Sequence, residues 1–340
     1  MANASKREAQ TEPSTDQKLI LAAKGNEKYT LTTRPSKKVR ATYKYKLTAP
    51  SYSASEWLLY AMHPPELPGQ MEVLFTMSPP GKKATESAAL ERSLWFAKLP
   101  VQEEKDKKHL ECEFEIKAQL YSRKLESRGG GGKKGQTWLS PGERSEYLAP
   151  KIWRAHDSPE FGEWLNQAKL KILAQEGQID FARRIFNHIV KDFRYEYLPG
   201  MDRKLMSICE SGKSDCGGLS ILFTSVLRAN DIPARLLFGR RAVTGQASDT
   251  YQAHAKAEFF AEGVGWVPVD CSSAIVSGEG NFFGNDDGNF IAFHVNDDIT
   301  VDVEEGRQLG IVWLQGFGYS ARGEGSFDKS SLKEEWIVRR

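Results

Sequence analysis

Three residues of the types used in nucleophilic catalysis follow one another in the second half of the chain: Cys216, His254 and Asp270. A cysteine thiol can attack a carbonyl carbon, an imidazole can take up the thiol proton, and a carboxylate can orient the imidazole. Together they are the groups needed for acyl transfer through a covalent intermediate. Each residue also has an ordinary structural interpretation. The catalytic interpretation therefore requires that the elements around the three residues bring them together.

Cys216 stands where a turn gives way to a helix. It follows the turn-like GKSD and begins a helix with an apolar face that is predicted to end near Asn230. The free N–H groups at a helix start favour an anion, so we expect the thiol pKa to be lowered there. Gly217 comes next, and its missing side chain leaves room for a substrate carbonyl, which makes it a candidate for the cleft or the oxyanion site. The alternative is a cysteine that simply begins a buried helix.

His254 and Asp270 are predicted to face each other across a β-hairpin. In QAHAKAEFF, His254 shares the polar face of a strand with Lys256 and Glu258. The turn EGVG at 262–265 leads into GWVPVDCS, so Asp270 is expected opposite a residue near 256. Because paired strands lie about 5 Å apart, Asp270 can then orient the imidazole. Taken singly, the histidine is as well explained by a surface or core position, and the aspartate by a turn.

The elements around these residues are predicted to be helices followed by strands. Ser158 and Pro159 are typical of a helix start, and helical spacing of apolar residues continues to about residue 175. A second helix is expected over 178–193. Strands are expected at 234–243, 253–261 and 265–272. This order predicts an α+β catalytic domain over 137–305, with helices before an antiparallel sheet, rather than alternating βαβ units.

The first part of the chain is predicted to be β-structure. VRATYKYKL and ECEFEIKAQLYS alternate polar and apolar residues, and shorter apolar runs with proline-rich turns lie between them. We therefore expect a β-sandwich domain at 28–127, preceded by a disordered tail at 1–27. The glycine run within 128–136 predicts a flexible linker. Residues 306–340 are expected to form a C-terminal strand extension.

Composition and charge narrow the range of partners. Hydrophobic residues make up 40% and charged residues 27% of the 340, as in ordinary globular proteins. A net charge of +2 does not favour nucleic acid or an acidic membrane as the main partner. No apolar run of about 18 residues is present, so no integral membrane segment is expected. The polar start lacks the core of a signal peptide, which leaves open a cytoplasmic protein or a periplasmic or secreted one whose signal was removed.

The four cysteines do not predict a disulfide scaffold or a zinc site, since they are few and none is spaced C-x-x-C. No cofactor or metal is expected. Cys112 falls on an apolar strand face and is interpreted as a core residue. Cys271 is expected to point away from Asp270, and Cys209 is either a loop thiol without a role or a redox partner of Cys216 or Cys271. NDDGN and NDD are interpreted as turns rather than calcium sites.

At the residues that can do chemistry, the chain resembles the transglutaminase-like superfamily, a papain-like group with the order Cys–His–Asp. The matching motifs, within roughly residues 160–300, are DCGGLSILFTSVLRANDIPARLLFGRR, HAKAEFF and GWVPVDCS. The resemblance implies that Cys216 is the nucleophile, His254 the general base and Asp270 its orienting acid. A β-rich domain in front of this one is common in bacterial members, so a bacterial-type, two-domain enzyme is implied.

The resemblance extends to FRYEY, where it implies that Tyr197, or else Tyr195, helps to shape the oxyanion site. Lys256 and Cys271 depart from residues common in the family and alter the cleft wall. The implied activity is thiol-dependent acyl transfer on a peptide, protein or other amide substrate, with hydrolysis expected ahead of cross-linking. The alternatives are a protein-glutamine amine transferase and a non-catalytic binding or scaffold protein that retains the fold. The residues do not specify an oligomeric state.

Overall fold

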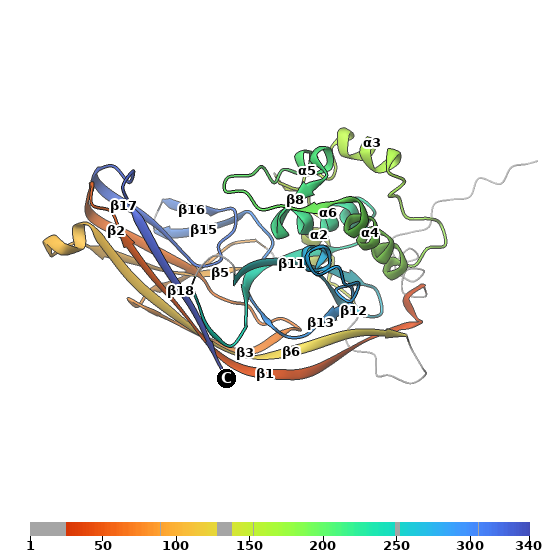
Figure 1. Ribbon diagram of the computed structural model, residues 1–340, viewed down its shortest axis with the longest axis horizontal. Coiled ribbons are helices and arrows are strands. Elements are labelled where there is room, and N and C mark those ends of the chain that lie inside the picture. The colour runs from red at the N-terminus through yellow and green to blue at the C-terminus, as the bar shows by residue number, and fades with distance from the viewer. Residues whose placement is uncertain (1–24, 89, 128–137, 152, 249–251, 305) are drawn as a thin grey trace, which may run out of the picture.

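The chain forms a two-sheet β-sandwich and an α+β unit that lies beside it (Figure 1). A computed structural model describes residues 25–340 except 89, 128–137, 152, 249–251 and 305. The predicted α+β fold class is confirmed, with helices that precede an antiparallel sheet. The linker expected at 128–136 lies outside the described residues.

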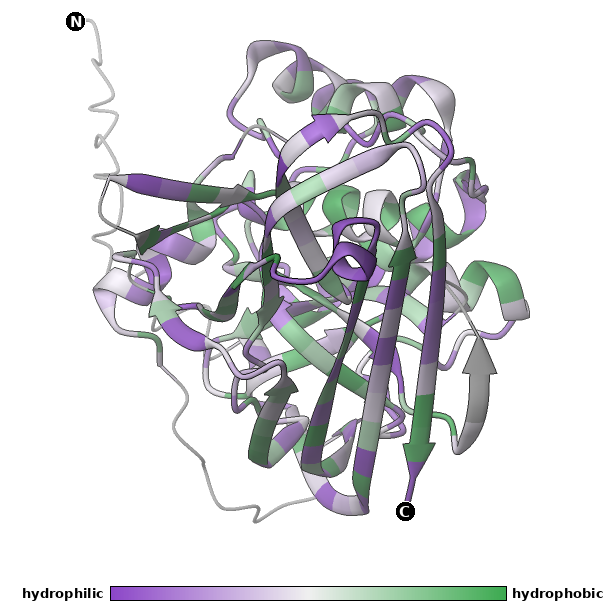
Figure 2. Ribbon diagram, turned by 90° about the vertical axis from the view of Figure 1, so that its left-hand side faces the viewer, coloured by the Kyte–Doolittle hydropathy of each residue, from purple (hydrophilic) through white to green (hydrophobic). Residues whose placement is uncertain are grey.

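The sandwich consists of two antiparallel sheets that share one hydrophobic core. Hydrophilic and hydrophobic residues alternate along its strands, so one face of each sheet supplies the core (Figure 2). The first sheet has the order β10 (Gly245–Ser248), β18 (Ser331–Arg339), β1 (Tyr29–Thr48), β6 (His109–Ser127) and β13 (Asn285–Asp286), with β3 (Gln70–Ser78) also paired to β6. The second has the order β17 (Phe317–Gly325), β2 (Tyr52–Met62), β5 (Ser93–Pro100) and β4 (Lys82–Thr85), and a 3-10 helix, η1, covers Glu104–Lys107.

Strands from the C-terminal end of the chain complete both sheets. β18 pairs with β1 from Arg40↔Arg339 to Thr48↔Ser331, and β17 pairs with β2. Trp336 in β18 is 1% exposed and lies in the core of the sandwich. The region expected at 28–127 therefore gains strands from 306–340, because β1 and β2 would otherwise leave a row of N–H and C=O groups unpaired.

The helices of the α+β unit pack against a further, four-stranded antiparallel sheet. This sheet has the order β12 (Gly265–Val269), β11 (Ala253–Ala261), β9 (Ala234–Arg241) and β14 (Phe290–Val295). The helices are α2 (Pro141–Leu148), α3 (Pro159–Gln167), α4 (Gln178–Asp192), α5 (Leu205–Ser211), α6 (Cys216–Arg228) and α7 (Cys271–Ser277). A small parallel pair, β7 (Arg194–Tyr195) with β8 (Lys213–Ser214), completes the unit. A small antiparallel pair, β15 (Ile299–Glu304) with β16 (Arg307–Ile311), packs instead into the core of the sandwich. α6 is buried from Gly217 to Arg228, which makes it the central helix.

Of the three predicted helices around the site, two agree with the structure and one ends earlier than predicted. α6 begins at Cys216 as predicted, and α4 agrees with the expected helix at 178–193 to within a residue. The helix predicted from Ser158 to about 175 ends instead at Gln167. Lys169 adopts a left-handed φ of 56°, and the N–H of Leu170 donates to the carbonyl of Leu165, a turn that ends a helix.

The long strands β1 and β6 connect the two units. They extend from the sandwich beneath the α+β unit (Figure 1), where β6 pairs with β13 through Lys124↔Asn285. Asn26, just before β1, is fully buried and donates to Gln178 Oε1 at 2.9 Å. The tail prediction therefore does not hold at residue 26, because that side chain is needed inside the α+β unit.

In the described part of the chain, no helix has both the length and the apolar character needed to cross a membrane.

Candidate active site

The cysteine of the predicted triad lies at the first turn of α6. The N-cap of this helix is Asp215, whose Oδ1 accepts the N–H of Gly218 at 3.0 Å. Arg203 pairs with the same carboxylate, with Nη2 and Oδ2 2.6 Å apart. The anion at the helix start is therefore the aspartate rather than a thiolate. The half-buried Cys216 sits directly beside this ion pair.

The Cys216 thiol is not acidic in the resting protein. Burial raises its pKa to about 12, the carboxylate of Asp215 acts in the same direction, and the backbone N–H groups of Ala255 and Gly217 only partly oppose them. The expectation of a lowered thiol pKa is therefore wrong, because loss of water and a neighbouring carboxylate outweigh the helix dipole. The contact with the backbone N–H of Ala255 also places the thiol. Because Ala255 belongs to β11, the thiol lies against the strand that carries His254.

His254 and Asp270 meet as the hairpin pattern predicts. β11 pairs with β12 from Ala261↔Gly265 to Ala257↔Val269, so the next position along β12 comes opposite residue 256. Here His254 Nε2 lies 2.7 Å from Asp270 Oδ2. The predicted contact between the two side chains is confirmed. The strand does not continue past this point, however, because Asp270 becomes the N-cap of α7.

Asp270 receives four hydrogen bonds. Oδ2 accepts from His254 and, at 2.8 Å, from Ser273 Oγ, while Oδ1 accepts from Ser272 Oγ and Ser273 N, both at 2.9 Å. Burial alone would raise the pKa of Asp270, but His254, Lys256 and the Ser273 N–H outweigh it and hold that pKa well below its usual range. Asp270 is therefore a fixed carboxylate. Ser272 and Ser273 were not predicted as site residues, although D-C-S-S after a strand is a helix-cap signal.

His254 is buried at 4% exposure rather than lying on an open polar face. Burial lowers its pKa, with Arg241 and Lys256 acting the same way against the opposing effect of Asp270. At neutral pH the pair is thus an ionised Asp270 beside a neutral imidazole. Since the carboxylate can only accept, the imidazole proton is on Nε2 and the lone pair is on Nδ1. Nδ1 is the nitrogen that can take a proton from a thiol.

A cavity of about 400 Å³ opens beside this pair. It is lined by Tyr195, Arg241, Ala253, His254, Ser272, Ser273, Val276, Ser277 and Phe282. Of the two tyrosines considered for the oxyanion site, the structure places Tyr195 on the cavity wall, whereas Tyr197 does not line it and is 54% exposed. The phenol of Tyr195 stays protonated, since burial and the nearby Cys216 raise its pKa to about 12.

The two glycines after Cys216 differ in what surrounds them. A Cβ on Gly217 would meet Asp215 Oδ1 at 3.4 Å and the Arg203 side chain at 3.7 Å, which are ordinary contacts. A Cβ on Gly218 would lie 1.9 Å from Ser214 Oγ. Gly218 therefore allows α6 to approach β8. Gly217 is buried beside Asp215 and Arg203 and is not among the residues that line the cavity, so its predicted place in the cleft stays a prediction.

The remaining cysteines and acid clusters have structural places. Cys271 opens α7 and is buried in the core of the α+β unit, and Cys112 is buried in the sandwich. Cys209 lies in α5 rather than in a loop. In NDDGN, Asp286 is buried and pairs with Arg123 and Lys256 instead of standing in an open turn. Among the described residues, no three acidic, histidine or cysteine side chains come together in a way that could hold a metal.

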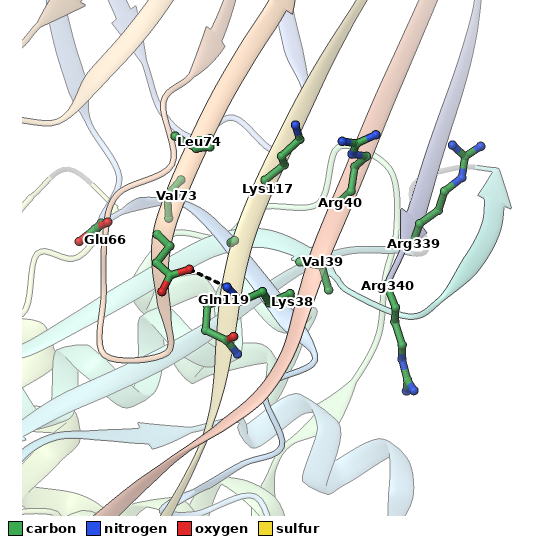
Figure 3. A pocket seen from close by; sticks show the side chains of 12 residues that line it. Lys38, Val39, Arg40, Glu66, Val73, Leu74, Lys117, Gln119, Arg339 and Arg340 are labelled. Carbon is green, nitrogen blue, oxygen red and sulfur yellow. Dashed lines mark hydrogen bonds and ion pairs between the residues drawn. The ribbon is translucent and has the colours of Figure 1, made fainter.

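A larger cavity, about 650 Å³, lies elsewhere, on the outer surface of the first sandwich sheet. Figure 3 shows basic side chains of several strands along it, among them Lys38, Lys117 and Arg339. Several of these charges are already compensated: Lys38 pairs with Glu72 at 3.1 Å, and Lys117 pairs with Glu115 at 3.5 Å. None of the three triad residues lines it, so the smaller cavity is the candidate active site.

A cysteine at the start of α6, a histidine on β11 and an aspartate at the N-cap of α7 define an α+β domain with a candidate cysteine active site. Residues 168–271, which include all three, match the family model of the Transglutaminase-like superfamily. No curated protein matches the chain.

Among solved structures, the chain is similar to a proposed cysteine protease from Cytophaga hutchinsonii, with a TM-score of 0.54 and 11% identity over 89% of this chain and 92% of that one. It is also similar to the periplasmic domain of TgpA from Pseudomonas aeruginosa, with a TM-score of 0.36 and 16% identity over 76% of this chain and 92% of that one. At such identities the first likeness establishes the fold alone.

Proposed function

We propose that this protein is a cysteine-dependent enzyme that hydrolyses an amide bond, in a peptide or another amide, through an acyl-enzyme on Cys216. The observation that supports this most directly is the 2.7 Å contact between His254 Nε2 and Asp270 Oδ2 on the strand against which the thiol lies. An oriented neutral base is what a thiol of high pKa requires, since it cannot attack as a free thiolate at neutral pH.

In the first half of the reaction, His254 Nδ1 takes the proton from Cys216 as the sulfur attacks the carbonyl carbon. The carbonyl π electrons move onto oxygen, and the backbone N–H at Cys216 is the proposed place for that oxyanion. Tyr195 lines the cavity and Tyr197 does not, so Tyr197 is no longer proposed as a hydroxyl donor to the oxyanion. When the intermediate collapses, the C–N bond breaks and His254 gives its proton to the leaving amine.

In the second half, water attacks the thioester carbonyl and His254 takes the water proton. The C–S bond then breaks and the proton returns to sulfur, so amide and water have become acid and amine. The cavity supports hydrolysis because several of its lining groups are hydroxyls that can hydrogen-bond water. An amine in place of water would give transfer by the same steps.

The test is turnover of a quenched fluorescent peptide library, with and without dansylcadaverine as an added amine. We expect cleavage by the wild type, a Cys216 adduct in the intact mass of trapped enzyme, and loss of both in Cys216→Ala and His254→Gln. Incorporation of the amine ahead of cleavage would replace hydrolysis with transfer. Unchanged turnover in Cys216→Ala would reject the proposal and favour a scaffold that retains the fold.

A further inference from the structure

We propose that the cavity beside His254 is an anion subsite, in which Arg241 binds a carboxylate of the substrate close to the amide that is cleaved. This inference rests on the proposed function, because it names the class of amide that the site would take. It follows from the side chains that line the cavity and from which of their hydrogen-bonding groups are already used.

Arg241 brings a positive charge to the wall of the cavity. It is the last residue of β9, it is half-buried, and its Nη2 lies 3.1 Å from Ser273 Oγ and 3.4 Å from His254 Nε2. Both side-chain contacts use the same nitrogen. Within the described ranges no carboxylate pairs with this guanidinium, so its Nε and Nη1 are available for a two-point contact with a planar anion.

Two further donors face the same space. The hydroxyl of Ser277 accepts the N–H of Glu279 at 3.1 Å, which leaves its own hydrogen to be donated. The phenol of Tyr195, on the opposite element β7, remains protonated because its pKa is raised to about 12. A guanidinium and two hydroxyl donors together suit the several lone pairs of a carboxylate.

Among the residues that the structure describes, no acidic side chain lines this cavity. Asp270 is the nearest carboxylate in the hydrogen-bond network, but His254, Ser272 and Ser273 occupy its oxygens and separate it from the open space. A bound carboxylate would therefore meet donors rather than another carboxylate. Its distance from the reacting groups would be short, since Arg241 already lies within 3.4 Å of the proposed base.

Arg241 also has a competing role, namely support of Asp270 through Ser273. The two roles make different predictions. A supporting residue would affect every substrate equally, whereas a subsite residue would affect only substrates that carry the carboxylate. The experiment therefore compares pairs of molecules that differ only in having a carboxylate or an amide.

The first experiment needs no turnover. The Cys216→Ala protein is titrated, by NMR, with N-acetyl-glutamate α-amide and N-acetyl-glutamine α-amide, and with propionate and propionamide. We expect the acidic member of at least one pair to bind about tenfold more tightly or better, since a hydrogen bond to a charged partner is worth more than a neutral one. Arg241→Gln should abolish that preference and Tyr195→Phe should reduce it. Equal binding within both pairs, or a preference that survives Arg241→Gln, would overturn the proposal.

Arg339→Gln is the matched control, because it removes the same charge from the sandwich sheet, outside this cavity (Figure 3), and should leave the preference intact. Arg241→Lys keeps the positive charge but lacks the planar, two-point geometry of a guanidinium, so it should retain part of the preference for the carboxylate.

If the protein cleaves peptides, Arg241→Gln should lower kcat/KM for Glu-containing substrates by about tenfold relative to their Gln counterparts. An equal loss for both would assign Arg241 to support of Asp270 and reject the subsite. Binding without any turnover would reject the proposed function and leave the subsite standing.

Discussion

His254 Nε2 lies 2.7 Å from Asp270 Oδ2, across a hairpin whose register brings residues 16 positions apart into contact. Because Asp270 is ionised, it accepts the Nε2 proton and leaves the Nδ1 lone pair free. The contact thus sets the tautomer of the imidazole as well as its position, and it is the feature on which the proposed chemistry most depends.

Asp270→Asn should abolish most of the activity while leaving the fold intact. The amide would donate to Nε2 and move the imidazole proton to Nδ1, so that His254 could no longer accept from the thiol. A wrong tautomer of this kind lowers kcat by about 10³–10⁴-fold. Steady-state cleavage of the best library peptide measures it, and activity within a few-fold of wild type would contradict the assignment.

Asp270→Ala provides the structural comparison. Asn can still accept the Ser273 N–H and cap α7, whereas Ala cannot, so only Ala should lose about 1 kcal/mol of stability from the missing cap. Urea unfolding of the two variants separates the cap from the chemistry.

The rate at which Cys216 is alkylated should depend on pH in the way expected of a thiol with a raised pKa. The thiolate fraction of a group with a pKa of about 12 keeps rising through pH 9, whereas a free thiol, with a pKa of about 8.5, levels off there. We therefore expect iodoacetamide labelling of Cys216, followed by mass spectrometry from pH 6 to 10, to rise steadily. N-acetylcysteine amide in the same tube is the reference. A fast, flat rate below pH 7 that His254→Ala removes would instead indicate a thiolate–imidazolium pair at rest.

Gly218→Ala should destabilise the protein much more than Gly217→Ala. The added methyl at 218 would overlap Ser214 Oγ at 1.9 Å, which forces α6 away from β8, while the methyl at 217 has an ordinary contact distance of 3.4 Å. Overpacking typically costs about 1–3 kcal/mol. Thermal unfolding of both variants tests this. Gly217→Ala should unfold like wild type.

Arg123→Met should cost about 3–5 kcal/mol of unfolding free energy, because it leaves buried carboxylates short of a partner. Arg123, from sandwich strand β6, is 2% exposed, and its guanidinium lies 2.5 Å from Glu258 on β11 and 3.2 Å from Asp286. It therefore ties the sandwich to the strand that carries His254.

Arg40→Met makes the same chemical change in the sandwich at an exposed pair, Arg40–Glu115 at 3.6 Å, and should cost at most about 1 kcal/mol. Denaturant unfolding of both variants gives the comparison. Similar losses for Arg123→Met and Arg40→Met would show that the buried cluster contributes little to stability.

The sequence by itself determined the local elements and the pairing of the site residues. Period-two alternation predicted β1 and β6, apolar spacing predicted α4 and α6, and a turn at 262–265 was enough to set the hairpin register that brings Asp270 to His254. These features are local or nearly so, and their physical basis is the fixed geometry of helices and strands.

Only the tertiary structure decided the features that depend on distant parts of the chain. The C-terminal strands join both sandwich sheets because unpaired edges must find partners, wherever these lie in the sequence. The thiol pKa rises rather than falls because burial and Asp215 act on Cys216 more strongly than the helix dipole does. Arg241 reaches the cavity through the packing of β9 beside β11. Desolvation and side-chain proximity are properties of the packed molecule, and no pattern along the chain encodes them directly.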